Sequence, residues 1–274
     1  MGKKKFNPLP GFGLTMGYTL LYLSVLVLIP IAGLFLKAFQ LSWTELWHLI
    51  ATPRALAAYK LTLSASMISA LVNAVFGTLL AWILVRYQFF GKRFIDALVD
   101  FPFALPTAVA GLTLSSLFAA NGWLGQFLVP LGIKGTYTPL GIIIALTFVG
   151  LPFVVRTLQP VLQNLEQEVE EAAATLGASR LRTFVQILIP TLFPTILTGF
   201  ALSFARAVGE YGSITFISGN LPYKTEIVPS LIVYQLEEHN YPGATAIAAV
   251  MLVVSFLILA LINWLEVWSG RFNK

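Results

Sequence analysis

The apolar residues of this chain fall into six long runs separated by short polar segments. A membrane-spanning helix needs about 20 apolar residues, because the hydrocarbon core is about 30 Å thick and a helix rises about 1.5 Å per residue. The chain is therefore predicted to be an all-α, polytopic membrane protein with a single domain, residues 1–274. The six predicted spans are Leu14–Leu36, Leu61–Val85, Leu98–Ala120, Leu140–Val155, Phe193–Ile217 and Ala244–Leu265.

Several features modify this simple pattern. Pro102 and Pro106 interrupt the third run and predict a bent helix, which neighbouring helices in a membrane can tolerate. The fourth span is short unless its helix continues toward Pro160. Two segments predicted on the outer side also have helical character. Leu41–Lys60, with its tryptophans, is typical of an interfacial amphipathic helix, and Ile227–Glu238 predicts another short helix.

Composition supports lipid as the solvent of this chain. Of its 274 residues, 57% are hydrophobic and 11% are charged, whereas soluble domains have roughly 45–50% apolar and about 25% charged residues. The net charge of +5 does not indicate nucleic-acid binding, because the basic residues flank apolar runs and form no single stripe. The sequence has no cysteine, and His48 and His239 are far apart, so no metal site is predicted.

The basic residues predict the orientation in the membrane. The first apolar run is too long for the core of a secretory signal, so it is expected to be a retained anchor. With the N-terminus inside, 11 of the 17 basic residues fall on the inner side, 5 on the outer side and Arg206 within a span. The positive-inside rule then predicts cytoplasmic N- and C-termini. The inner set is Lys3, Lys4, Lys5, Arg86, Lys92, Arg93, Arg156, Arg180, Arg182, Arg271 and Lys274; the outer set is Lys37, Arg54, Lys60, Lys134 and Lys224.

The largest inner loop, at about residues 157–190, predicts two helices joined by a turn. Glutamates and alanines from Glu166 to Ala174 favour a helix, and Gly177 suits a left-handed C-terminal cap. Ser179 is a good N-cap for a second short helix that ends at Leu188, before Pro190 starts the next span. Helix propensity alone leaves open an ordinary solvated connector.

A spaced motif in this loop favours a more specific interpretation. Glu171-Ala172-Ala173, three residues, Gly177, nine residues and then Ile187-Leu188-Ile189-Pro190 closely resemble the EAA loop of bacterial ABC importer permeases, with Ile189 where leucine is usual. In such permeases the short helix docks into a cleft of the ATPase subunit and transmits its closure to the membrane helices. The resemblance implies a type I importer fold and assigns coupling to Glu170, Glu171, Ala172, Ala173, Leu176 and Gly177.

Three other runs narrow the resemblance to one group. Asp100–Leu114 (DFPFALPTAVAGLTL), Leu151–Thr157 and the Arg206…Gly209-Glu210-Tyr211-Gly212 run are similar to the sulfate/thiosulfate permeases, most of all to the CysT type. Molybdate permeases share much of this pattern, so molybdate or tungstate is the alternative substrate. In this group the permease moves a tetrahedral oxyanion across the inner membrane.

The resemblance also implies partners. These are a second homologous permease subunit of the CysW type, a dimer of CysA-type ATP-binding subunits and a periplasmic sulfate/thiosulfate-binding protein. The chain has no Gly-x-x-x-x-Gly-Lys-Ser/Thr motif, so we expect no ATPase activity of its own, and ATP and Mg²⁺ bound only by the partner ATPase. An ion-coupled secondary transporter and a membrane-embedded enzyme remain as rival classes. A secondary transporter would need a relay of embedded carboxylates, and an enzyme would need a catalytic cluster; the sequence shows neither pattern.

Charged residues within the spans are candidates for the translocation path. Arg206 and Glu210 lie four residues apart in the predicted fifth span and can neutralise each other on one helix face. They are either a structural pair that locks the bundle or a pair that lines the path and balances an anion. Thr107 and Ser203 are further path candidates, because hydroxyls bind anions weakly. Asp96 and Asp100 lie near the inner membrane face and are expected to be solvated residues at a helix start, where the helix dipole favours a negative charge.

Overall fold

The computed structural model describes residues 11–165 and 167–270. The predictions that concern Lys3, Lys4, Lys5, Glu166, Arg271 and Lys274 fall outside these ranges. Within them, every regular element is helical. In chain order the elements are α1 (Phe12–Leu23), η1 (Ser24–Leu28), α2 (Ile29–Phe39), α3 (Trp43–Ile50), α4 (Pro53–Arg86), α5 (Lys92–Ala104), α6 (Thr107–Phe118), α7 (Gly125–Leu128), η2 (Val129–Leu131), α8 (Pro139–Asn164), α9 (Gln167–Thr175), α10 (Arg180–Thr183), η3 (Phe184–Leu188), α11 (Ile189–Val208), α12 (Gly212–Ser218), α13 (Val228–Glu237) and α14 (Tyr241–Gly270).

Five helices are long and apolar enough to cross a membrane, and a sixth span exists if the bent pair α5–α6 is counted as one. The five are Phe12–Phe39, Pro53–Arg86, Pro139–Asn164, Arg180–Val208 and Tyr241–Trp268. The prediction of about six membrane segments is therefore confirmed. The fourth membrane segment is α8. Its helix continues through Pro160 to Asn164, so it is longer than the apolar run alone.

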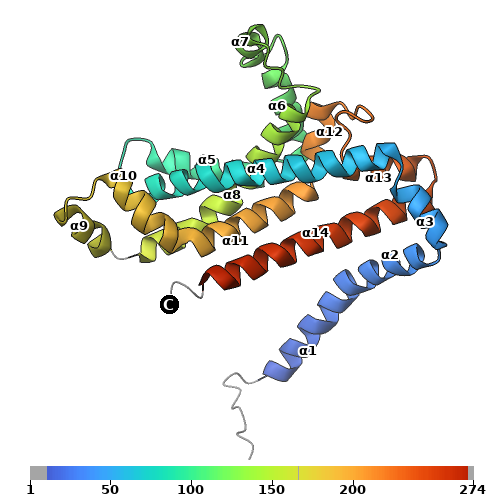
Figure 1. Cartoon of the computed structure of the whole chain (residues 1–274), viewed down its shortest axis with the longest axis horizontal. Coiled ribbons are helices and arrows are strands. Elements are labelled where there is room, and N and C mark those ends of the chain that lie inside the picture. The colour runs from blue at the N-terminus through green and yellow to red at the C-terminus, as the bar shows by residue number, and fades with distance from the viewer. Residues whose placement is uncertain (1–10, 166, 271–274) are drawn as a thin grey trace, which may run out of the picture.

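The third segment is not a straight span. α5 and α6 meet at an angle of 115°, with the break just before Thr107. Pro102 lies inside α5, whereas Pro106 sits at the bend as the N-cap residue of α6. As a result α6 runs across the other long helices instead of beside them (Figure 1). The two prolines were expected to bend this segment, but the sequence did not predict so sharp a turn.

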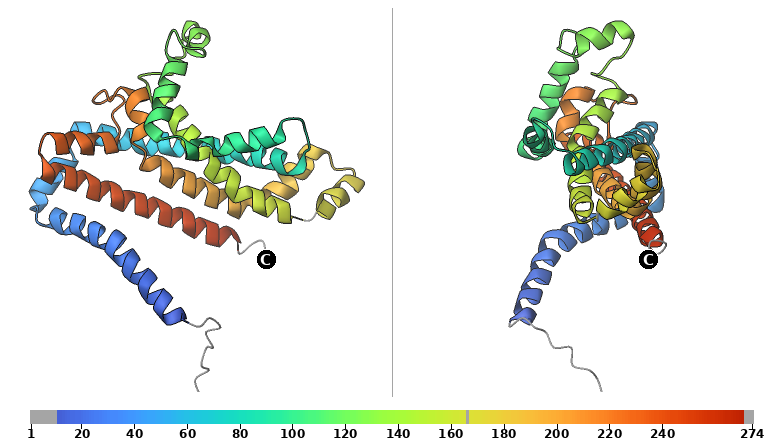
Figure 2. Two further views of the ribbon diagram at one scale, coloured as in Figure 1. Left: turned by 180° about the vertical axis from the view of Figure 1, so that it is seen from behind. Right: turned by 90° about the vertical axis from the view of Figure 1, so that its left-hand side faces the viewer.

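The bundle core is formed by α4, α8 and α11, with α14 packed on α11 (Figure 1). Many residues that α4 buries in this core are small, so its neighbours approach closely, as is usual for membrane helices. α8 contributes larger buried side chains, among them Ile142, Leu146 and Leu158. This arrangement gives an elongated body with two ends. One end carries α9 and α10, and the other carries α3 and α13 (Figures 1 and 2).

The predicted fifth span is wrong at both ends. The predicted short helix from Ser179 does not stop at Leu188, because α10, η3 and α11 join into one helix from Arg180 to Val208. Proline lacks an N–H, and the wide π-helical turn η3 adapts the backbone just before Pro190. At the other end α11 stops at Val208, and α12 starts as a separate short helix at Gly212.

The first helix is the most isolated part of the bundle. α2 contacts α14, but α1 leans away from the other helices and buries no residue (Figures 1 and 2). The interfacial helix expected at 41–60 forms as α3 over a shorter range, and residues 53–60 instead start α4. Ser42 and Glu45 form a capping box that fixes the start of α3. The short helix predicted at Ile227–Glu238 is confirmed as α13.

Candidate functional site

The loop with the spaced Glu-Ala-Ala motif forms the expected short helix and turn. α9 ends in a left-handed turn at Gly177, whose φ is +82°. The Gly177 amide donates to the Ala174 carbonyl and the Ala178 amide to the Ala173 carbonyl, both at 3.0 Å, which is the Schellman pattern. The Ser179 hydroxyl then accepts from the Arg182 amide and caps the next helix. A side chain at position 177 would be strained by the backbone angle alone, since no other atom lies within 4 Å of its Cβ position.

The coupling residues named from the sequence divide between two sides of α9. Ala173 is buried against the chain, and Glu170 is half-buried. Glu171, Ala172 and Gly177 are exposed, and Leu176 is 88% exposed. Such an exposed leucine beside an exposed glutamate suits contact with another protein. The exposed residues of α9 are therefore accessible to a partner, whereas Glu170 and Ala173 contact the rest of the chain.

Glu170 forms an ion pair that joins α9 to α4. Its Oε1 lies 2.7 Å from Nε of Arg86, the last residue of α4, and the two side chains are 24% and 9% exposed. Arg86 also donates from Nη2 to the Leu165 carbonyl at 3.1 Å. A groove of about 320 Å³ follows this contact, and Trp82 and Arg180 are among the residues that line it. Sequence reasoning placed Arg86 on the inner side but did not pair it with Glu170.

Arg206 and Glu210 form the ion pair that their spacing predicted. Their location differs from the prediction, because Glu210 follows the end of α11 and does not lie within a continuous span. The Glu210 carboxylate is 2% exposed, and its Oε1 accepts from the Ser213 amide at 2.8 Å, at the start of α12. The Arg206 side chain is 31% exposed. The pair therefore helps to fix the angle between α11 and α12, while part of the Arg206 side chain remains exposed.

Thr107 lies next to this break. It is the first residue of α6, and a Cβ at Gly212 would come within 2.2 Å of its Oγ1. α6 and α12 are therefore in close contact at the point where both the third and the fifth segments bend. Among the glycines of this region, Gly199 faces Val154 of α8 and Gly212 faces Thr107, whereas Gly209 approaches no other described helix.

Ser203 occupies a different environment from Thr107. Its hydroxyl accepts from the Asn73 side-chain amide at 3.0 Å and is fully buried between helices. Gly150 of α8 leaves the room for this contact, since a Cβ there would lie 2.4 Å from Ser203 Oγ. Ser203 thus serves the packing of α4, α8 and α11 in this conformation and does not face an open path.

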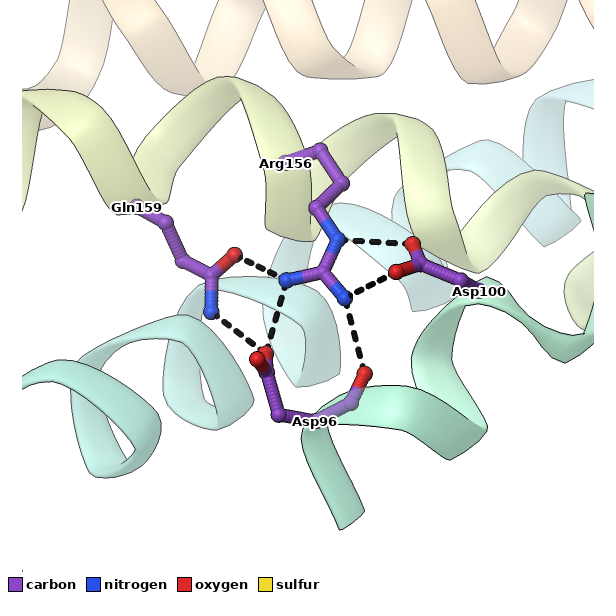
Figure 3. A network of polar contacts seen from close by, with 4 residues as sticks. All are labelled: Asp96, Asp100, Arg156 and Gln159. Atoms are coloured by element: carbon purple, nitrogen blue, oxygen red, sulfur yellow. Dashed lines mark hydrogen bonds and ion pairs between the residues drawn. The ribbon is translucent and has the colours of Figure 1, made fainter. Parts of the chain in front are cut away.

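Asp96 and Asp100 are partly solvated, as expected, but the sequence did not predict their ion pairs. Both bind Arg156 of α8 (Figure 3). Arg156 donates two hydrogen bonds to the Asp100 carboxylate, with an Nε–Oδ1 distance of 2.7 Å and an Nη2–Oδ2 distance of 2.6 Å. It also donates to Oδ1 and to the backbone carbonyl of Asp96, at 2.7 Å each. Gln159 bonds both Arg156 and Asp96. This network joins α5 to α8. The Arg156 side chain is 30% exposed, and those of Asp96 and Asp100 are 44% and 50% exposed.

A second missed pair lies at the opposite end of the bundle. Arg54 binds Glu226 with two hydrogen bonds of 2.7 Å, and its guanidinium carbon lies 3.9 Å from the ring centre of Tyr234. Glu226 directly precedes the N-cap residue of α13, so the pair joins α13 to α4. Sequence alone gave no partner for either residue, because 172 positions separate them. For Arg156 a signal existed: Asp96 and Asp100 share a helix face at i,i+4, and all three residues were predicted on the inner side.

Comparison with known proteins agrees with this architecture. The family of binding-protein-dependent transport system inner membrane components matches residues 73–268. The sulfate transport system permease protein CysT of Salmonella typhimurium is 51% identical over 96% of this chain and 95% of its own length. CysT of Synechocystis is 49% identical over 93% and 89%.

A solved structure of a bacterial alginate ABC transporter, in complex with a periplasmic protein bound to an alginate pentasaccharide, has the same fold. Its TM-score is 0.77 at 20% identity, over 95% of this chain and 94% of the other. The bundle of membrane helices, the family match over residues 73–268 and the relatives of about 50% identity over nearly the whole chain point to one conclusion. The chain is a multi-span membrane protein that belongs to the family of inner membrane components of binding-protein-dependent transport systems, in its CysT group.

Proposed function

We propose that this chain is the permease subunit of an ATP-driven importer of sulfate and thiosulfate. The observation that carries the proposal is the match, at about half of all positions and over nearly the full length, to permeases named for sulfate transport. The alginate importer with the same fold is only 20% identical, so it supports the architecture and not the substrate. Molybdate or tungstate import is the second candidate.

The partners follow from this role. A second, CysW-type permease subunit completes the pathway, and a CysA-type dimer binds ATP and Mg²⁺ and hydrolyses the nucleotide. A periplasmic sulfate/thiosulfate-binding protein delivers the anion. The end of the bundle with α9 faces the cytoplasm, together with both termini, because most of the basic residues between spans fall on that side.

The continuous helix from Arg180 to Val208 suggests how coupling reaches the outer part of the path. It starts three residues after the Gly177 turn and ends two residues before Glu210. With 29 residues, it is roughly 43 Å long at about 1.5 Å per residue. A continuous helix of this length would carry a displacement of α9 to the α11–α12 break. There the Arg206–Glu210 pair and the α6–α12 contact move with it.

The path is expected to handle a doubly charged anion by weak contacts. Glu210 is matched by Arg206, so it offers no unpaired negative charge to repel the anion. The exposed part of Arg206 and the Thr107 hydroxyl lie near the same break and can each donate to an oxyanion. Weak donors favour passage over retention. Selection between sulfate and molybdate is then left to the binding protein.

The test is uptake of labelled sulfate by cells that lack this chain, with and without its restoration. Restored uptake that needs an intact partner ATPase is the expected result. Loss of molybdate uptake with sulfate uptake untouched would refute the substrate while leaving the importer class in place. Purification of the chain without any ATPase, with uptake driven by an ion gradient, would refute the class as well.

A further inference from the structure

A cavity lies where α4, α5 and α8 meet, at the end of the bundle that carries α9. Its volume is about 540 Å³. Most of its polar wall consists of cations and amides, with one carboxylate. The residues that line it are Leu84, Val85, Gln88, Phe89, Gly91, Lys92, Arg93, Asp96, Gln159 and Gln163.

The charges of this cavity favour an anion. Lys92 and Arg93 form no ion pair with any described side chain. Asp96 is the acid in the wall, and it is already held by Arg156 and Gln159 (Figure 3). Arg156 also binds Asp100, so two carboxylates share one guanidinium and the network has a net charge of one negative unit. Lys92 and Arg93 together add two positive charges. The site as a whole is left with a single positive charge.

Neutral donors and aromatic residues surround these cations. The amides of Gln88 and Gln163 reach the cavity from α4's C-terminal loop and from α8, and both residues are exposed. Beside the cavity, Phe90 is fully exposed and Phe94 is 68% exposed. Exposed phenylalanines next to basic residues are typical of segments at the membrane interface, where the rings enter the acyl region and the cations meet the headgroups.

We infer that this cavity binds the phosphodiester headgroup of an anionic phospholipid, such as phosphatidylglycerol, from the cytoplasmic leaflet. The chemistry is that of a tetrahedral oxyanion, which free sulfate or phosphate shares. The single surplus positive charge matches a phosphodiester, which carries one negative charge, better than sulfate, which carries two. The two exposed phenylalanines would contact the acyl chains. The inference rests on the proposed function only in assigning this end to the cytoplasmic side.

Native mass spectrometry of the whole transporter, titrated with phosphatidylglycerol or with phosphatidylcholine, tests the site. The variant Lys92→Gln/Arg93→Gln removes both free cations. Lys60→Gln/Lys134→Gln removes the same charge from the side predicted to be outside and serves as the matched control. Each cation near an anionic headgroup contributes roughly fivefold in affinity, so the first variant is expected to bind phosphatidylglycerol about 30-fold more weakly. The control and the binding of phosphatidylcholine should be unchanged.

A second arm separates the two sources of oxyanion. Free sulfate and free phosphate are added in millimolar excess to the lipid-bound transporter. Retention of the lipid supports the inference, and its displacement would show that the site takes a free oxyanion instead. Equal lipid binding by the Lys92→Gln/Arg93→Gln variant and the wild type would overturn the inference. If the cation variant fails to assemble, the milder variant Gln163→Leu tests the site instead. It keeps all charges and should weaken lipid binding by a few-fold. None of these results bears on sulfate uptake, so the proposed function is tested separately.

Discussion

Replacing Glu170 by glutamine removes one half of the ion pair that ties α9 to α4. The change keeps the size of the side chain and leaves the exposed face of α9 untouched. Arg86, at 9% exposure, would then keep only its hydrogen bond to the Leu165 carbonyl. We expect α9 to lose its fixed position against α4, and sulfate transport to become poorly coupled to ATP hydrolysis.

The magnitude follows from the burial of the two partners. Breaking a fully buried pair costs about 3–5 kcal/mol, whereas exposed pairs contribute about 0–1 kcal/mol. With Glu170 24% exposed, an intermediate cost of about 1–3 kcal/mol is expected, which shifts the docked population of α9 by roughly 5- to 150-fold. The double variant Arg86→Gln/Glu170→Gln should cost less than the sum of the single changes, because it leaves no unpaired cation behind.

Two measurements on the assembled transporter check this prediction. Amide hydrogen exchange over residues 167–175 reports the docking of α9, and proteoliposomes report sulfate moved per ATP hydrolysed. Glu171→Gln is the matched control, since Glu171 is exposed and forms no ion pair with any described residue. It should leave exchange within α9 unchanged and weaken ATPase binding instead. Unchanged exchange in Glu170→Gln, or single effects that simply add, would refute the idea that the pair holds α9.

Three further predictions concern the turn, the break and the orientation. Gly177→Leu should abolish transport in a fully inserted chain, because φ is +82° there; normal uptake would reduce the loop to a plain connector. Glu210→Ala should lower the yield of folded protein more than Glu210→Ala with Arg206→Ala, since the single change leaves a cation unpaired; restored folding without restored transport would place the pair in the path. A cysteine at Lys224 should react with an impermeant reagent added outside cells, and one at Gln163 should not, which the reverse labelling pattern would contradict.

Local rules in the sequence were sufficient for much of the helix pattern. Apolar runs long enough to span a membrane marked all six segments, and alanines, glutamates, Gly177 and Ser179 marked the helix α9 and its turn. Four-residue spacing gave the Arg206–Glu210 pair, since residues one turn apart on a helix are neighbours whatever surrounds them. Even here the local rule failed to show that α11 ends between them.

Contacts between distant residues were decided only by the tertiary structure. The pairs Arg86–Glu170, Arg156–Asp100 and Arg54–Glu226 join helices that are far apart in sequence, and no periodicity within one helix specifies such a partner. The 115° bend between α5 and α6 likewise needs more than Pro106, because a proline permits a range of bends and the packing of α6 against α12 selects one. The sequence by itself determined a membrane bundle and a short helix with its turn in the largest loop, because hydrophobicity and helix propensity act locally. Which helices meet, and which charges they neutralise, depends on the relative placement of whole helices.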